Sequence, residues 1–321
     1  MARSAREASG ARLWPALVAG ALLVGSVWTR PDIGAALVML GAAFFLLERW
    51  RPLRAQASAL RRPGAATDAT GFIVDEIVAG IGLTGVLLVV LPVVGQVMPA
   101  DVPRYLSAQP GWLRWAEAFV VSEVSGYWGH RLSHQIPALW RFHRVHHSAP
   151  QLDWLAPNRR HPIDLIVARS STSLPVLMLG FTVPTVITYF ALKRIQGLFV
   201  HANVDLRFGP LERVVATPFF HHWHHSAEPG TWNKNYAGSI PAVDWLFGTL
   251  HLPAHWPRAY GCEGSVPDSG YVARIVSPWK VAGNQATSSD PVTRWPGRQH
   301  DGTGIKGSSR LSSQLRGRFD S

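Results

Sequence analysis

The chain has 321 residues, of which 47% are hydrophobic and only 16% are charged. Soluble globular proteins carry roughly 25% charged residues, so this composition favours a membrane protein. We interpret the net charge of +11 as basic loops beside apolar spans, held by anionic lipid head groups, rather than as a nucleic-acid-binding surface. The single cysteine, Cys262, excludes an intramolecular disulfide and multi-cysteine metal sites. Any metal must therefore be bound by nitrogen and oxygen atoms.

Four apolar regions follow one another along the chain. Residues 13–28 and 33–47 are each shorter than the roughly 20 residues that cross hydrocarbon, and the break at 29–32 lets them form a helical hairpin. Residues 77–97 are the best single span, because they contain no charge, although Pro92 can introduce a kink. Residues 163–192 are too many for one simple span, so we expect a hairpin or re-entrant pair bent near Pro175 or Pro184. A weaker helical stretch at 115–128 carries Glu117 and Glu123.

The basic residues predict an orientation and a division of the chain. Arginines flank the first two spans on one side, at positions 3, 6, 12, 49, 51, 54, 61 and 62. The positive-inside rule places these segments in the cytoplasm, and the later histidines join them there if both 77–97 and 115–128 cross. We expect an all-α, multi-pass helical bundle of the inner or cell membrane. It comprises an N-terminal transmembrane hairpin and basic loop (1–69), a main domain (70–260) and a disordered basic tail (278–321).

The histidines are concentrated in one part of the chain. Of 14 histidines, 11 lie between positions 130 and 225. They form one H-x-x-x-H motif and two H-x-x-H-H motifs, which read HRLSH (130–134), HRVHH (143–147) and HHWHH (221–225). Residues three or four apart share one face of a helix. Each triplet can therefore offer its imidazoles to one metal ion, or straddle two.

Chemistry favours a metal as the reason for gathering these rings. Imidazole suits iron, zinc, copper and nickel. Packed histidinium ions would repel one another, and neutral rings would leave N–H groups without partners, whereas a shared cation resolves both problems. Eight or nine imidazoles exceed the needs of one tetrahedral zinc and fit two ions. We interpret His251, His255 and His300 as ordinary polar residues, and treat His222 likewise because it is the variable position of its motif.

These motifs, in this order between apolar segments, resemble the fatty acid hydroxylase and sterol desaturase superfamily of membrane di-iron proteins. The similar segments are 127–134, 139–148, 201–205, 217–226 and 235–249. Ala237 stands where the family commonly has glycine. The resemblance implies that residues 70–260 form a catalytic domain for O2-dependent hydroxylation or desaturation of a fatty acyl, sterol or related lipid. It also implies the metal ligands His130, His134, His143, His146, His147, His201, His221, His224 and His225.

The resemblance further implies two iron ions, for which zinc can substitute, and O2 as cosubstrate. It implies a membrane lipid substrate and, because we see no fused cytochrome b5-like region, a separate electron-transfer protein; no nucleic-acid partner is expected. Candidates for supporting the metal ligands are His161, Asp205, Asp244 and Glu123, together with Asp153 and Asp164. Asp205 is also a candidate for direct metal binding. Arg131, Arg141 and Arg144 are candidates for holding a polar head group.

Two other functions fit parts of the pattern. A membrane zinc-dependent hydrolase is the main alternative, although the H-E-x-x-H motif of many such enzymes is absent from the sequence. A metal transporter or sensor is the second. A transporter should carry polar residues along several full-length spans, whereas these histidines cluster outside the apolar regions.

Overall fold

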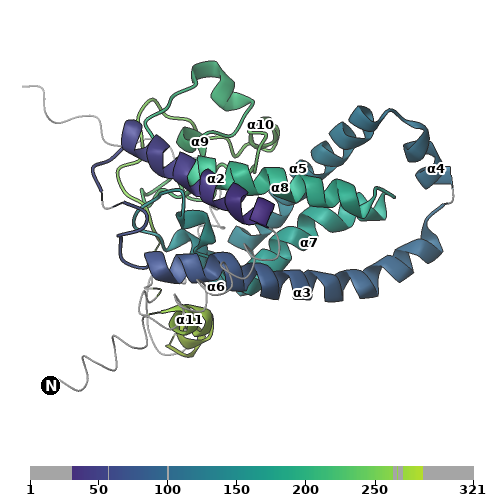
Figure 1. Ribbon diagram of the computed structural model, residues 1–321, viewed down its shortest axis with the longest axis horizontal. Coiled ribbons are helices and arrows are strands. Elements are labelled where there is room, and N and C mark those ends of the chain that lie inside the picture. Colours follow the sequence, from purple (N-terminus) through teal and green to yellow (C-terminus); the bar gives the residue numbers. More distant parts are fainter. Residues whose placement is uncertain (1–30, 57, 100, 263–265, 267–269, 285–321) are drawn as a thin grey trace, which may run out of the picture.

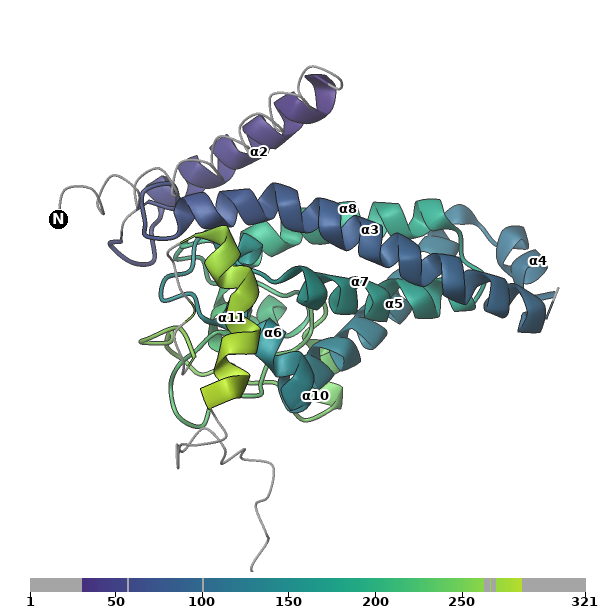
Figure 2. The ribbon, with the colours of Figure 1, turned by 90° about the horizontal axis from the view of Figure 1, so that it is seen from below.

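A computed structural model describes residues 31–56, 58–99, 101–262, 266 and 270–284. These residues are helical and irregular, with two isolated bridges, Pro52–Val204 and Ser226–Tyr260. Four helices, α3 (Ala65–Val97), α5 (Gly111–Gln135), α7 (Pro162–Met178) and α8 (Val183–His201), extend from a body of shorter elements toward α4 (Asp101–Ala108) (Figures 1 and 2). Helix α2 (Pro31–Trp50) diverges from them. The all-α prediction is confirmed for this part of the chain. The expected span at 13–28 lies outside it.

The longest helix begins well before the predicted span. Helix α2 covers Pro31–Trp50, and α3 covers Ala65–Val97, so α3 starts at Ala65 rather than at residue 77. Its first turns bury polar side chains, whereas its later part exposes apolar ones such as Ile81 and Leu88, each at least 70% exposed. In the described residues α3 is the one helix whose length and hydropathy suit a membrane crossing.

Prolines set the ends of the next helices. Helix α4 (Asp101–Ala108) is followed by α5 (Gly111–Gln135), which contains the predicted stretch 115–128 and the HRLSH motif. Pro137 cannot continue α5, because it has no N–H to donate. It instead starts α6 (Pro137–His147), which carries the HRVHH motif. The first two histidine motifs therefore lie on either side of one bend.

The expected hairpin at 163–192 is present as two helices. Helix α7 covers Pro162–Met178 and α8 covers Val183–His201. Gly180 between them has a φ of 88°, which side chains disfavour, and Pro184 lies in the first turn of α8. The bend is thus located at residues 179–182. Helix α8 ends at His201, on the side of the body.

The rest of the body consists of short helices and irregular segments. The 3-10 turns η1 (Ala156–Asn158) and η2 (Gly209–Arg213) precede α7 and α9 respectively. Helix α9 (Pro218–His224) carries most of the HHWHH motif, and its N-cap Thr217 accepts a hydrogen bond from the Phe220 N–H at 3.4 Å. Helix α10 (Ala242–Leu246) follows.

A buried ionic network attaches α11 to the rest of the fold. This part of the structure also differs from two of the sequence predictions. Arg274 of α11 (Tyr271–Asn284) is bonded to Asp68 of α3, which also accepts a 2.6 Å contact from Arg62. Arg62 is bonded in turn to Asp153, so this acid supports the fold and no imidazole. Residues 278–284, which we assigned to the disordered tail, are helical. The boundary placed at residue 69 lies inside α3.

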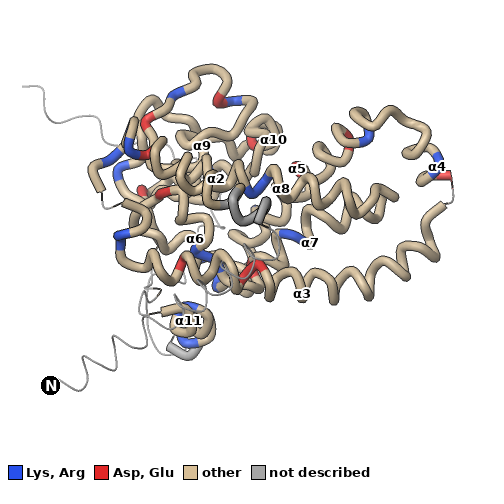
Figure 3. Tube along the Cα trace, in the orientation of Figure 1, with Lys and Arg blue, Asp and Glu red and all other residues tan. Residues whose placement is uncertain are grey.

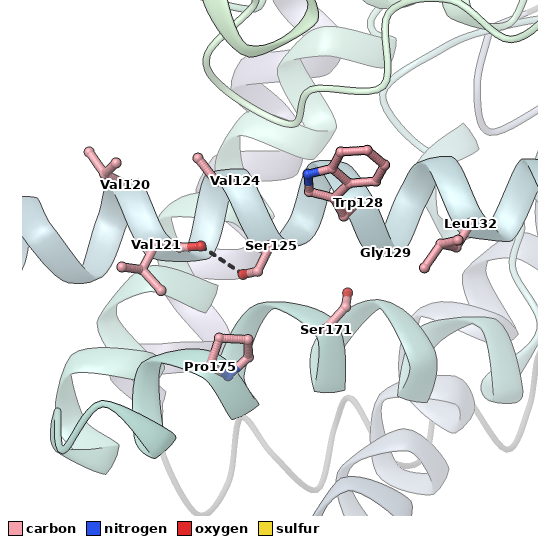
Figure 4. Close-up of a pocket in the computed structure, with 9 residues that line it drawn as sticks. All are labelled: Val120, Val121, Val124, Ser125, Trp128, Gly129, Leu132, Ser171 and Pro175. Carbon is pink, nitrogen blue, oxygen red and sulfur yellow. Dashed lines mark hydrogen bonds between the residues drawn. The ribbon is translucent and has the colours of Figure 1, made fainter. Parts of the chain in front are cut away.

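Helices α5 and α7 pack closely against each other. An added Cβ at Gly129 would collide with the Ser171 side chain, and one at Gly126 would lie 2.8 Å from Thr172 Cγ2. An apolar groove of about 620 Å³ lies along the contact between α5 and α7 (Figure 4). Its lining includes Val121, Trp128 and Pro175. The small residues let the two backbones approach, and so bring the histidine end of α5 against α7.

Replacing Gly129 with Val is expected to lower the free energy of unfolding by about 1–3 kcal/mol, because the side chain must force α5 away from α7. The measurement is thermal unfolding of the detergent-solubilised protein. Gly85→Ala on α3 is the matched control, since a Cβ there meets nothing within 4 Å. Equal unfolding temperatures for the two variants would contradict the tight α5–α7 contact.

Candidate metal centre

The nine histidines expected to bind metal all lie at one place in the body. They form two groups, and within each group the ligand atoms lie within 4.8 Å of one another. We call the first group cluster A; it contains His130, His134, His143, His147 and His224. We call the second group cluster B; it contains His146, His201, His221 and His225. Seven of the nine residues are buried, and His130 and His221 are partly buried.

Each H-x-x-H-H motif contributes to both clusters. On α6, His143 and His147 belong to cluster A and His146 to cluster B. In the second motif the division is reversed, since His221 and His225 belong to cluster B and His224 to cluster A. Residues four apart share a face of the helix, and the residue between them points to the side. Each triplet therefore straddles the two clusters.

The two clusters adjoin each other. The rings of His147 and His225 stack with their centroids 4.4 Å apart. The His146 and His225 ring centroids are 4.6 Å apart, and those of His147 and His224 are also 4.6 Å apart. Segments 143–147 and 221–225, far apart in sequence, thus meet on the same side of the molecule.

Hydrogen bonds fix the protonated nitrogen of several rings. The Nδ1–H of His130 donates to the Tyr236 carbonyl at 2.7 Å, and that of His143 donates to Asp164 Oδ1 at 2.8 Å. In cluster B, the Nδ1–H of His201 donates to the Gly197 carbonyl at 2.8 Å and that of His146 to the Arg159 carbonyl at 3.3 Å. A neutral imidazole carries one proton, so Nε2 of each ring presents a lone pair.

These lone pairs face one another. The two Nε2 atoms of His130 and His143 are 3.1 Å apart, and those of His146 and His201 are 3.2 Å apart. Two acceptor nitrogens cannot form a hydrogen bond with each other, so each contact is repulsive unless a cation lies between the rings. The donor set, all nitrogen from imidazole, suits iron or zinc. Each cluster therefore fits one metal ion.

Burial supports the same conclusion. Among the described residues, the buried atoms His134 Nε2, His224 Nε2 and His225 Nδ1 have no hydrogen-bond partner. Desolvation lowers the pKa of His146, His147, His221 and His225 well below the usual value of 6.5. Neutral imidazole is the form that binds metal. The fold thus holds the rings in the ligating state.

A cavity of about 800 Å³ reaches the clusters from between α3, α5, α7 and α8. Its wall includes His130 and His143 of cluster A and His146, His201 and His221 of cluster B. Apolar residues such as Ile77, Ile187 and Phe190 line its other parts. The cavity therefore connects the imidazoles with the side of the apolar helix segments.

Three of the acids predicted to support the metal ligands hold the clusters in different ways. Asp164 contacts His143 directly. Asp244 accepts hydrogen bonds from the backbone N–H groups of Tyr236 and Ala237, both at 2.8 Å, and so holds the segment whose carbonyl orients His130. Glu123 holds the same segment at a second point, since it accepts a 2.6 Å hydrogen bond from the backbone N–H of Ser239.

Two other candidates do not support an imidazole of either cluster. His161 accepts a hydrogen bond from the Ile163 N–H at the start of α7, and its other ring nitrogen lies 3.1 Å from the Ile275 carbonyl. Asp205 is exposed and accepts a hydrogen bond from Trp256 Nε1 at 3.1 Å, so it stands outside both clusters. In the described part of the chain, His161 thus caps α7 and Asp205 bonds to Trp256, and neither is hydrogen-bonded to a cluster imidazole.

The cationic candidates for head-group binding also lie elsewhere. Arg131 donates to the Tyr127 hydroxyl at 3.0 Å, Arg141 lies over the Phe142 ring, and Arg144 is buried. Among the described residues, none of the three lines the cavity, whose basic residues are Arg160, Arg169, Lys193 and Arg194. His222, which was treated as an ordinary polar residue, is buried and bonded to the Tyr260 hydroxyl at 2.7 Å.

Sequence reasoning missed the backbone acceptors that orient the rings. The carbonyls of Arg159, Gly197, Lys234 and Tyr236 each face an imidazole Nδ1. A carbonyl belongs to every residue, so no side-chain pattern could indicate them. Asn235 was a detectable signal: it takes a φ of 57° and bonds to backbone atoms of both Phe220 and His251. The positive φ falls on Asn235, so Ala237 in place of glycine meets no strain.

Comparison with known proteins identifies the histidine-containing part of the chain. Residues 115–249 match the family model for fatty acid hydroxylase. No solved structure matches the chain significantly.

Curated relatives match the same region. An ornithine lipid hydroxylase of Rhizobium tropici is 35% identical over 182 residues, which cover 54% of each chain. Human alkylglycerol monooxygenase is 30% identical over 42% of this chain and 30% of its own length. A very-long-chain aldehyde decarbonylase of Oryza sativa subsp. indica is 26% identical over 41% of this chain and 50% of its own. The chain thus spans about half, or less, of the relatives it matches.

Replacing Asp164 with Asn is expected to weaken metal binding about 10- to 100-fold, because the amide can present its N–H₂ to His143 and favour the wrong tautomer. The measurement is metal content after dialysis against a graded series of chelator concentrations. Asp205→Asn is the matched control, since this exposed acid accepts a hydrogen bond from Trp256 Nε1 and belongs to neither cluster. Equal metal loss from both variants would contradict the role of Asp164.

The metal-free protein is expected to lose stability as the pH falls below about 6.5. The folded state lowers the pKa of His224 to about 3, largely by burial, from 6.5 in the unfolded chain. Between about pH 3 and 6.5 the unfolded state therefore binds more protons than the folded state, so the free energy of unfolding falls as the pH falls. Above pH 6.5 this contribution to stability is fully present. The measurement is unfolding temperature between about pH 5 and 8. An unfolding temperature that stays constant over this range would contradict it.

Proposed function

We propose that this chain, a member of the fatty acid hydroxylase superfamily, is a membrane oxygenase that hydroxylates a lipid at a di-iron centre. The observation that carries the proposal is the pair of adjoining imidazole clusters, with Nε2 lone pairs 3.1 Å and 3.2 Å apart. The cavity that reaches both clusters supports a lipid as the substrate. Iron bound there supplies the capacity to reduce O2 and to oxidise an unactivated C–H bond.

The chain's own residues hold and orient the reacting groups. Cluster A and cluster B supply neutral nitrogen ligands, and Asp164 keeps the His143 ring in the ligating tautomer. Burial of the clusters excludes bulk water, so reactive species are shielded from side reactions. The cavity walls of α3, α5, α7 and α8 restrict the lipid to few orientations, which places one carbon near the clusters.

Hydroxylation is favoured over desaturation by the relatives. One is named a lipid hydroxylase and another a monooxygenase. In such a reaction one oxygen atom of O2 replaces a C–H bond by C–OH, and the other leaves as water after taking up two electrons and two protons. A separate electron-transfer protein supplies those electrons in our proposal.

We place the enzyme in a membrane with its clusters at the cytoplasmic face. The apolar, exposed later part of α3 supports the membrane location. The side follows from the arginines that precede α3, which include Arg49, Arg51, Arg54 and Arg61. Helices α6 and α9, which carry histidines of both clusters, lie near the end where α3 begins, and these arginines precede that end in the sequence (Figure 1).

His146→Ala and His224→Ala, which remove one ligand from each cluster, are both expected to abolish product formation and to lower iron content. The assay supplies purified protein with lipid extract, O2 and a chemical reductant, and detects a mass gain of one oxygen in lipids. His255→Ala is the control, because this ring is exposed and contacts the Trp256 carbonyl.

The same assay under anaerobic conditions separates the proposal from its alternatives. Cleavage of the lipid with uptake of water in the absence of O2 would indicate a hydrolase, whereas a mass loss of two hydrogens that requires O2 would indicate a desaturase. Full turnover by either cluster variant would contradict a di-iron centre formed by both clusters.

A further inference from the structure

The cavity carries charged side chains between its apolar part and the imidazoles. We call these residues the charged belt; they are Glu76 of α3, Glu123 of α5, Arg169 of α7, and Lys193 and Arg194 of α8. Every one of the four helices around the cavity thus contributes to it. Lipid-facing cavities are mostly apolar, with a few polar groups that fix orientation, so a ring of five ionisable residues requires a reason.

The belt lies at one level, about two helical turns from the clusters. Glu123 precedes His130 by seven residues on α5, and Arg194 precedes His201 by seven residues on α8. At about 1.5 Å per residue, each separation is about 10 Å along the helix. Beyond the belt, α3 has no charged residue from Ile77 to Val97. Figure 3 shows this uncharged stretch between the body and α4.

The belt contains one more cation than it has acids. Arg169 is bonded to Glu76, and Lys193 lies 3.1 Å from Glu123 Oε1 and 2.7 Å from the Ser239 hydroxyl. Arg194 lies 3.6 Å from the already paired Glu76 and donates to Asn158 Oδ1 at 2.6 Å. The deeper pair Arg160–Asp164, at 3.2 Å, is balanced. The excess positive charge therefore belongs to Arg194, on the cavity wall.

Resting on the proposed function, we propose that the charged belt binds an anionic oxygen of a lipid head group through Arg194 and Arg169. The lipid tails then lie along the apolar parts of the helices, and the head group or its neighbouring carbons face the clusters. The opposite orientation would pass an apolar tail through the belt and desolvate its ions without compensation. The reaction is thereby directed to the polar end of the lipid rather than to the middle of a tail.

The anion can be a phosphate or a carboxylate, since a guanidinium binds either in the same two-pronged geometry. Free inorganic phosphate shares this chemistry. The apolar cavity wall on the outer side of the belt, with Ile77 and Ile187, favours a lipid over a free ion. Ile187 is 61% exposed and Ile77 49%, so the belt is accessible from the side of the apolar helix segments.

Binding of defined lipids tests the proposal without requiring turnover. Purified full-length protein in detergent is titrated with dioleoylphosphatidylglycerol, oleoylglycine and dioleoylglycerol, and with inorganic phosphate alone. Native mass spectrometry gives the bound fraction. We expect the two anionic lipids to bind more tightly than dioleoylglycerol. Arg194→Gln is expected to weaken their binding about tenfold, and Arg194→Lys is expected to retain part of the preference.

Glu76→Gln distinguishes ligand binding from a purely structural ion pair. It removes the acid shared by Arg169 and Arg194, so anionic lipids are expected to bind as tightly as before or more tightly. Arg104→Gln on α4 is the matched control, because Arg104 is exposed and pairs with Asp101. Parallel loss of binding in Glu76→Gln and Arg194→Gln, or unchanged preference in Arg194→Gln, would overturn the proposal. Should Arg194→Gln fail to fold, Glu76→Gln decides alone.

The remaining outcomes distinguish a lipid head group from a free anion as the ligand. They also distinguish failure of this inference from failure of the proposed function. If inorganic phosphate binds as tightly as the lipids and displaces them, the belt serves a free anion and the lipid assignment is wrong. Fragmentation of the oxidised lipid is expected to place the new oxygen on the head group or the carbons next to it; oxygen at mid-chain would overturn the orientation. Anion-selective binding without any oxidised product would sustain the belt's role while contradicting the proposed function.

Discussion

The site depends on acceptor nitrogens held against one another. In each cluster a backbone carbonyl or a carboxylate accepts a hydrogen bond from Nδ1–H. The unprotonated Nε2 atoms of His130 and His143, and of His146 and His201, are therefore left facing each other at 3.1–3.2 Å. Such contacts are unfavourable in a buried, metal-free protein. The packing of the surrounding helices must offset that repulsion. The fold therefore holds the rings in place for a cation before one binds.

The remaining structure serves to bring four histidine-bearing segments to one point. The bend at Pro137 folds α6 back beside the end of α5, and the α7–α8 turn returns the chain so that His201 enters cluster B. Asp244 and Glu123 hold the segment around Tyr236 from two directions, and this segment orients His130. Metal geometry is therefore controlled by residues that bind no metal.

Much of this arrangement could be predicted from the sequence, because spacing and hydropathy are local signals. The nine histidines and the hairpin at 163–192 are of this kind. The rest depends on contacts between distant residues: Arg274 pairs with Asp68, 206 residues away, which explains the helix where a disordered tail was expected. Asp153 and Asp164 looked equivalent as supporting acids, yet only the folded path shows that one pairs with Arg62 and the other with His143. A hydropathy window likewise cannot detect the polar first turns of α3.

The first turns of α3 are polar, and they lie between the body of the protein and the apolar part of the same helix. Its buried Asp68 anchors the helix in the body, and its Glu76 enters the cavity immediately before the apolar stretch begins. In the proposed function, one helix thus determines both how deep the protein sits in a bilayer and where the charged belt meets the lipid. Because the clusters lie about two helical turns inside that level along α5 and α8, the depth of the belt limits which carbon of a bilayer lipid can approach the imidazoles. On this geometry, regioselectivity is set by the membrane boundary as much as by the shape of the cavity.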